Sequence, residues 1–140
     1  MPSVVLDPNV LISAAISGKG APAFVIAAWS NGEFQLVVSP KLLDELEAVL
    51  LRPKFRKYIS KAEVQAYVRK LRALATFFPD PPPQPGLTPD PKDDYLVSLG
   101  RAAGVDYLVS GDPDLLNLSN ARPPVITASA FASTLHAQRP

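Results

Sequence analysis

Short apolar runs alternate with helix-start signals along the chain, and this alternation restricts the fold more than any other feature. Runs rich in valine and leucine lie at residues 4–6, 34–38 and 106–110, and a shorter run lies at 125–126. Each run is typical of a strand. Strands that alternate with helices need crossover connections and therefore form a mostly parallel sheet. We predict an α/β fold for this chain.

The segments between these runs carry the signals of helices. Ser39-Pro40 combines an N-cap residue with proline in the first helical turn. Ser60 and Glu63 have the spacing of a capping box, and Gly104 is a typical helix end. The expected helices cover residues 9–17, 22–29, 40 to just before 53, 61 to about 75, and 91–103, with a last helix after residue 127.

Length and composition favour one globular domain spanning residues 1–140, of which 47% are hydrophobic. The chain has no cysteine, which excludes disulfides and thiolate metal sites. No apolar run reaches the roughly 20 residues that a membrane span needs. The N-terminus lacks the basic start of a signal peptide, so a cytoplasmic protein without membrane contact is expected.

Seven prolines lie between residues 79 and 91. Such a segment is expected to be extended, in the polyproline II conformation. We interpret it as a surface loop and not as a domain boundary, because too little chain follows it to form an independent core.

The charges are unevenly distributed although the net charge is only +1. Eight of the 14 Lys and Arg residues lie between residues 52 and 72, and six of the 13 acids lie between residues 90 and 114. Two solvated faces would explain this, and so would an acidic site beside a basic surface that binds a polyanion. Under the second interpretation, Arg52, Arg56 and Lys57 are candidates for nucleic-acid contact.

Two acids follow predicted strands. Asp7 ends the first run and Asp112 comes just after the run at 106–110. In parallel sheets, sites form beyond the carboxyl ends of the strands, so both side chains would project from the same edge. A buried charge at Asp7 is costly unless it is paired; it serves either as a helix cap or as the ligand of a cation.

Helical periodicity adds further candidates and leaves choices open. Glu45 and Glu47 border opposite flanks of the apolar stripe of their helix, and periodicity does not choose between them. With Asp90 as N-cap, Asp93 occupies a position where an acid stabilises the helix start. Asp93 is also expected nearer the apolar stripe than Asp94.

Together, Asp7, Glu45, Asp93 and Asp112 would form a cluster of carboxylates. Clustered carboxylates repel one another unless a cation neutralises them, and oxygen ligands suit Mg²⁺ or Mn²⁺. Such a site can activate water and stabilise charge on a phosphate during hydrolysis. Asn9 would orient a ligand or a water molecule.

The segments VVLDPNVLIS, SPKLLDELEAVLLRPKF and DPKDDYLVSLGRAAGVDYLVSGDPDLL, in this order, resemble the PIN-domain family, and more closely its branch of bacterial toxins from toxin–antitoxin pairs. The resemblance implies a three-layer α/β/α sandwich with a central, mostly parallel sheet. It also implies a Mg²⁺- or Mn²⁺-dependent ribonuclease that acts on RNA, an antitoxin partner and a homodimer.

The resemblance also implies roles for individual residues. It selects Glu45 over Glu47 and Asp93 over Asp94, which would fit one residue out of step. The implied catalytic and metal-binding acids are Asp7, Glu45, Asp93 and Asp112, with Asn9, Asp94 and Asp114 as accessory residues. One position departs from the family, because Pro8 replaces the usual Thr or Ser and removes both a hydroxyl and an amide.

Two other interpretations remain open. A haloacid dehalogenase-type phosphatase needs a second Asp two residues after the first, where this chain has Asn9, and a well-placed Lys, for which there is no clear candidate. A catalytically impaired binding module with the same fold is compatible with Pro8. Binding of Mn²⁺ would discriminate, because an inactive module need not bind the ion.

Overall fold

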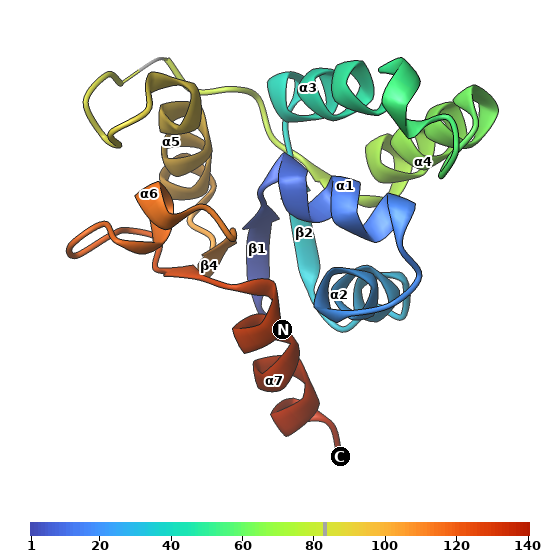
Figure 1. Ribbon diagram of the computed structural model, residues 1–140. Coiled ribbons are helices and arrows are strands. Elements are labelled where there is room, and N and C mark those ends of the chain that lie inside the picture. The colour runs from blue at the N-terminus through green and yellow to red at the C-terminus, as the bar shows by residue number, and fades with distance from the viewer. Residues whose placement is uncertain (83) are drawn as a thin grey trace.

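The computed structural model describes residues 1–82 and 84–140, which form a parallel sheet between layers of helices (Figure 1). The sheet has the order β3-β2-β1-β4-β5, and every neighbouring pair is parallel. This confirms the predicted α/β class and the parallel sheet. The strands within the described residues are β1 (Ser3–Leu6), β2 (Gln35–Val38), β3 (Thr76–Phe77), β4 (Tyr107–Val109) and β5 (Val125–Ile126).

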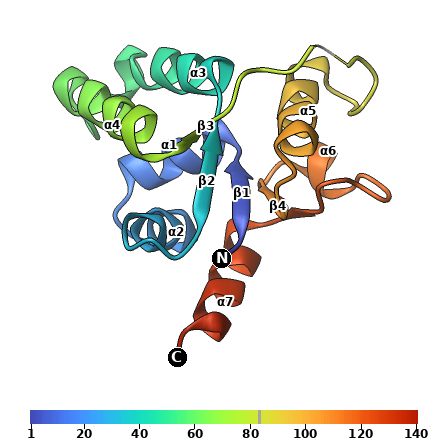
Figure 2. The same ribbon diagram turned by 180° about the vertical axis from the view of Figure 1, so that it is seen from behind.

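Helices cover both faces of the sheet, as expected for three layers. Helices α1 to α4 lie on one side and α5 and α6 on the other, in both the front view and the view from behind (Figures 1 and 2). Helix α5 packs on β1 and β4, and the C-terminal helix α7 packs on α2. The helices are α1 (Pro8–Ile16), α2 (Ala21–Ser30), α3 (Pro40–Leu50), α4 (Lys61–Leu74), α5 (Asp94–Ala103), α6 (Pro113–Leu116) and α7 (Ala128–Gln138), with 3₁₀ turns at Pro53–Phe55 and Pro91–Asp93.

Local sequence signals begin and end these helices as predicted. The Ser39 hydroxyl accepts a hydrogen bond from the Leu42 amide at the start of α3. Ser60 and Glu63 form the reciprocal capping box of α4. Gly104 ends α5 with a φ of +64°, a left-handed conformation that favours glycine.

The core lies between the sheet and the helix layers. The strands β1, β2 and β4 contribute apolar side chains with almost no exposed surface, and α3 buries the leucine stripe that the sequence predicted. Within the described residues, no single helix is long and apolar enough to cross a membrane. Helices α1 and α2 reach such a length only together, and they meet at 94°.

The strand order reverses between β1 and β4, and this reversal positions the site. From β1 the chain proceeds outward to β2 and β3, and then crosses back to β4 on the other side of β1. Leu6 of β1 is in register with Val109 of β4, and the Asp7 amide donates a hydrogen bond of 2.9 Å to the Val109 carbonyl. Such a switch point leaves a crevice beyond the carboxyl ends of the two strands, where α/β proteins bind their ligands.

Two segments differ from the sequence prediction. The sequence GDPD at residues 111–114 is typical of a turn, but residues 113–116 form the short helix α6 because Asp112 caps it. The proline-rich segment is not uniformly extended, since residues 85–86 form a turn and residues 87–90 bend. The part of the polyproline prediction that falls on Pro83 lies outside the described residues.

Candidate metal centre

Asp7 is buried at the switch point, with only 4% of its surface exposed. Its Oδ1 accepts a hydrogen bond of 2.9 Å from the Asn9 amide, which makes Asp7 the N-cap of α1. Its Oδ2 accepts a hydrogen bond of 2.8 Å from the Ser110 hydroxyl. Burial raises the pKa of Asp7, the two hydrogen bonds oppose this, and the charge of Asp112 adds to it. Asp7 is therefore a fixed carboxylate whose charge is stabilised only in part.

Ser110 links the two strand ends, although no sequence motif pointed to it. Its hydroxyl donates to Asp7 and accepts a hydrogen bond of 3.0 Å from the Asp112 amide, and it has no exposed surface. The signal that could have found it is register: Ser110 directly follows β4 as Asp7 directly follows β1. Ser110 therefore fixes the position of the Asp7 side chain relative to the backbone of Asp112.

Asp93 and Asp112 are in direct contact. Asp112 caps α6 through its Oδ1, which accepts a hydrogen bond of 2.9 Å from the Asp114 amide. Burial, a hydrogen bond to Asp112, and the charges of Asp112 and Asp7 together raise the pKa of Asp93 to about 7. Among the residues that the structure describes, the buried Oδ2 of Asp93 has no hydrogen-bond partner. Ionising Asp93 in this environment is therefore costly, and a nearby cation would remove that cost.

Glu45 approaches the same centre from α3. Its side chain is solvent-accessible, and its Oε1 accepts a hydrogen bond of 3.1 Å from the Tyr95 hydroxyl of α5. Partial desolvation raises the pKa of Glu45, and the hydrogen bond from Tyr95 opposes the shift; the charge of Asp7 raises it further, whereas Lys41 and Lys92 lower it. The four predicted acids thus influence one another across the switch point.

Asp94 has a different environment from Asp93. It is buried, with 7% of its surface exposed, and its carboxylate accepts hydrogen bonds from the Gly86 amide and from the amide and hydroxyl of Thr88. The expectation that Asp93 lies nearer the apolar interior than Asp94 is wrong. The reason is the 3₁₀ turn at Pro91–Asp93, which has about three residues per turn and changes the helical phase.

The other predicted accessory residues contribute through their backbone. Asn9 and Asp114 donate their amides to Asp7 and Asp112, while their side chains are exposed. Neither side chain makes a hydrogen bond with the carboxylates in the part of the chain that the structure describes.

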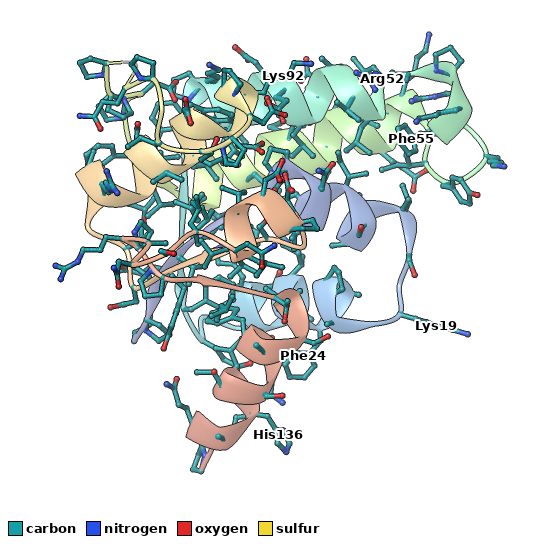
Figure 3. The ribbon with its side chains drawn as sticks, turned by 60° about the vertical axis from the view of Figure 1, so that its left-hand side comes forward. Lys19, Phe24, Arg52, Phe55, Lys92 and His136 are labelled. Atoms are coloured by element: carbon teal, nitrogen blue, oxygen red, sulfur yellow. The ribbon has the colours of Figure 1, made fainter. Side chains whose placement is uncertain are left out.

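The predicted basic residues lie beyond the C-terminal end of α3. In Figure 3, Arg52 and Phe55 lie at that end, whereas Lys92 lies in the 3₁₀ turn just before α5. Arg52 and Lys57 are exposed, but the guanidinium of Arg56 donates to the carbonyls of Leu50 and Arg52. Arg56 therefore caps the end of α3. Lys41 and Lys92 are the cations whose charges lower the pKa of Glu45, and both lie outside the basic cluster at residues 52–72.

The carboxylates fit a hard divalent cation by their chemistry. Their oxygens are the ligands that Mg²⁺ and Mn²⁺ prefer, and the unpaired Oδ2 of Asp93 is the free acceptor such an ion would use. Within the described residues, no three acidic or histidine side chains stand close enough to form a ready-made coordination group. An ion would therefore have to complete its shell with water or by side-chain adjustment.

A doubly wound parallel α/β fold with acids gathered at its switch point defines the class of this protein. Residues 3–114 match the family model described as PIN domain, so the chain belongs to the PIN-domain family. PIN domains are generally nucleases. This membership leaves no support for the haloacid dehalogenase alternative.

Two similar proteins extend the comparison. The uncharacterised protein MJ1680 of Methanocaldococcus jannaschii is 25% identical over 115 residues, which cover 82% of this chain and 74% of that protein. The crystal structure of PAE2754 from Pyrobaculum aerophilum has a TM-score of 0.65 at 16% identity and covers 99% of this chain and 91% of that one. The second likeness shows the fold, including three layers around a parallel sheet.

Proposed function

We propose that this chain is an endoribonuclease that depends on Mg²⁺ or Mn²⁺. The observation that carries the proposal is the convergence of Asp7, Asp93 and Asp112 at the switch point, together with the buried, unpaired oxygen of Asp93. Glu45 completes the set from α3. PIN domains are generally nucleases, and this supports phosphodiester hydrolysis as the reaction.

The four acids would hold the cation, which when bound supplies charge neutralisation and an activated water for phosphodiester hydrolysis. Ser110 and the Asn9 amide fix the orientation of the Asp7 carboxylate through their hydrogen bonds. Tyr95 restrains Glu45 through its hydroxyl. Burial and the neighbouring Asp112 and Asp7 raise the pKa of Asp93 to about 7, so Asp93 retains below that pH a proton that a bound cation would displace.

RNA and an antitoxin are the proposed partners. The order of the sequence motifs supports the toxin branch of the family, and with it a homodimer. Lys41 and Lys92, whose charges lower the pKa of Glu45, would attract the phosphate backbone toward the acids. Induced expression in a bacterial host tests the toxin role: growth should stop with the wild type and continue with Asp93→Asn. Growth unaffected by the wild type would contradict it.

The enzymatic proposal is tested with end-labelled single-stranded and structured RNA, incubated with the protein in Mg²⁺, in Mn²⁺ or in EDTA. Cleavage should require the ion and should be lost in Asp93→Asn. Asp44→Asn is the matched control, because it makes the same substitution at an exposed aspartate, and it should cleave at the wild-type rate. Equal cleavage by Asp93→Asn and the control would refute the proposed centre.

One observation favours a second function, the catalytically impaired binding module. Pro8 is buried in the first turn of α1, and both oxygens of Asp7 are already hydrogen-bonded. Calorimetry with Mn²⁺ discriminates: heat of binding that disappears in Asp7→Asn supports the enzyme. Absence of binding to the wild type supports the module.

A further inference from the structure

A pocket of about 450 Å³ lies beside the acidic centre, between α5 and the proline-rich segment. Its lining includes Lys41, Tyr95 and Ser98, together with Pro85 and Pro91. The volume falls within the range of pockets that bind small organic groups. Tyr95 connects this pocket to the acids, because its hydroxyl donates to Glu45.

Ser98 gives the pocket an unused polar group. It is 5% exposed, it lines the pocket from α5, and among the described residues its hydroxyl has no hydrogen-bond partner. A buried hydroxyl without a partner is unfavourable in a folded protein. An occupant that can donate or accept a hydrogen bond would satisfy it.

The walls of the pocket are held in place before any ligand arrives. Asp94 fixes the proline-rich segment through three hydrogen bonds from Gly86 and Thr88. Asp80 is tied to the start of α3, since its Oδ2 accepts a hydrogen bond of 2.9 Å from the Lys41 amide. A preformed site loses less conformational entropy on binding.

The lining chemistry selects the occupant. The lining contains two carboxylates, Asp80 and Asp94, and one ammonium, that of Lys41, so a phosphate or another anion is disfavoured inside the pocket. The Tyr95 ring and the prolines favour a flat apolar face, and Ser98 offers one hydrogen bond. A neutral, planar, hydrogen-bonding heterocycle has all of these properties.

We infer that this pocket accepts an unstacked nucleobase of a single-stranded RNA whose backbone lies at the acidic centre. Proteins that bind single strands commonly receive bases on aromatic side chains. Lys41, whose ammonium lies 4.7 Å from the centre of the Tyr95 ring, is placed to meet the phosphate next to that base. This inference rests on the proposed function, because it supplies the RNA.

The test measures binding without cleavage. A labelled single-stranded oligoribonucleotide and its abasic counterpart are titrated with the wild type in EDTA, with fluorescence anisotropy as the readout. The wild type should bind the base-bearing strand at least about fivefold more tightly. Ser98→Ala should weaken that binding by about fivefold, the equivalent of one hydrogen bond, and should leave the abasic strand unaffected.

Ser98→Ala is a clean variant because it removes an unpaired buried hydroxyl and places a better helix former in α5. Its melting temperature should equal or exceed that of the wild type, so weaker binding cannot come from unfolding. Ser133→Ala, an exposed serine on α7, is the control and should bind like the wild type.

The outcomes separate this inference from the proposed function. Equal affinity of the wild type for both strands, or unchanged affinity in Ser98→Ala, would overturn the base pocket even if RNA is cleaved. Base-dependent binding that Ser98→Ala reduces would support the pocket even if no cleavage occurs with any cation. Absence of binding to either strand would overturn the assignment to RNA.

Discussion

Replacing Asp93 by Asn should stabilise the metal-free protein, and the gain should depend on pH. In the native state burial, the contact with Asp112 and the nearby charges raise the pKa of Asp93 from 3.8 to about 7. The native state therefore keeps a proton that the unfolded chain releases above about pH 4. Because the native state binds more protons in this window, the free energy of unfolding falls as the pH rises from about 4 to about 7.

The magnitude follows from the shift. About three pKa units at about 1.4 kcal/mol each give about 4 kcal/mol, and solvent screening of a partly exposed carboxyl reduces this to about 2 kcal/mol. Asn carries no charge at any pH. The stability gap between Asp93→Asn and the wild type should therefore be near zero at pH 4 and about 2 kcal/mol above pH 7, or about 6 °C in melting temperature.

Thermal unfolding in EDTA between pH 4 and pH 8 measures this gap, with Asp44→Asn as the control. Addition of Mn²⁺ should then raise the melting temperature of the wild type far more than that of Asp93→Asn, because the ion binds the native state only. A gap that does not change with pH, or a variant less stable than the wild type at pH 8, would refute the repulsion argument.

Four other substitutions test neighbouring parts of the structure. Asp7→Asn should keep the cap of α1 and the stability of the metal-free protein but lose cleavage, as a melting curve and a cleavage assay will show. Ser110→Ala should lower the free energy of unfolding by about 1–3 kcal/mol in denaturant titration, because it leaves a buried carboxylate oxygen unpaired; an unchanged midpoint would contradict this. Arg56→Ala should lower the melting temperature by freeing the end of α3, whereas Lys57→Ala should leave it unchanged and reduce the salt dependence of RNA binding. The opposite pattern would make Arg56 the nucleic-acid contact.

Local signals were sufficient for most of the fold. Ser39-Pro40 and the pair Ser60 and Glu63 begin helices through contacts within three residues, so the sequence alone predicts them. The parallel sheet followed from the alternation of strands and helices. β3 was missed because its two residues, Thr76 and Phe77, are exposed and lack the burial that marks a strand in sequence.

The candidate site was less accessible to sequence reasoning. Local patterns placed Asp7 and Asp112 at strand ends, where the structure also has them. The environments of Asp93 and Asp94 depend on a 3₁₀ turn and on Thr88, six residues before Asp94, which anchors the proline-rich segment. Arg56 belongs to the cluster of basic residues in the sequence and was therefore expected at the surface. The sequence does not reveal that its side chain donates a hydrogen bond to the Leu50 carbonyl of α3.

The N-cap residues of α1 and α6 are also candidate metal ligands. The fold can therefore be retained in evolution when the chemistry is lost. Asp7 and Asp112 each begin a helix, and asparagine begins a helix equally well. A single nucleotide change converts an Asp codon into an Asn codon. A lineage that loses its chemistry by this route keeps a folded protein and loses a source of charge repulsion. Selection on stability would then do nothing to restore the acid, so inactive descendants of such a chain would persist wherever binding alone is useful.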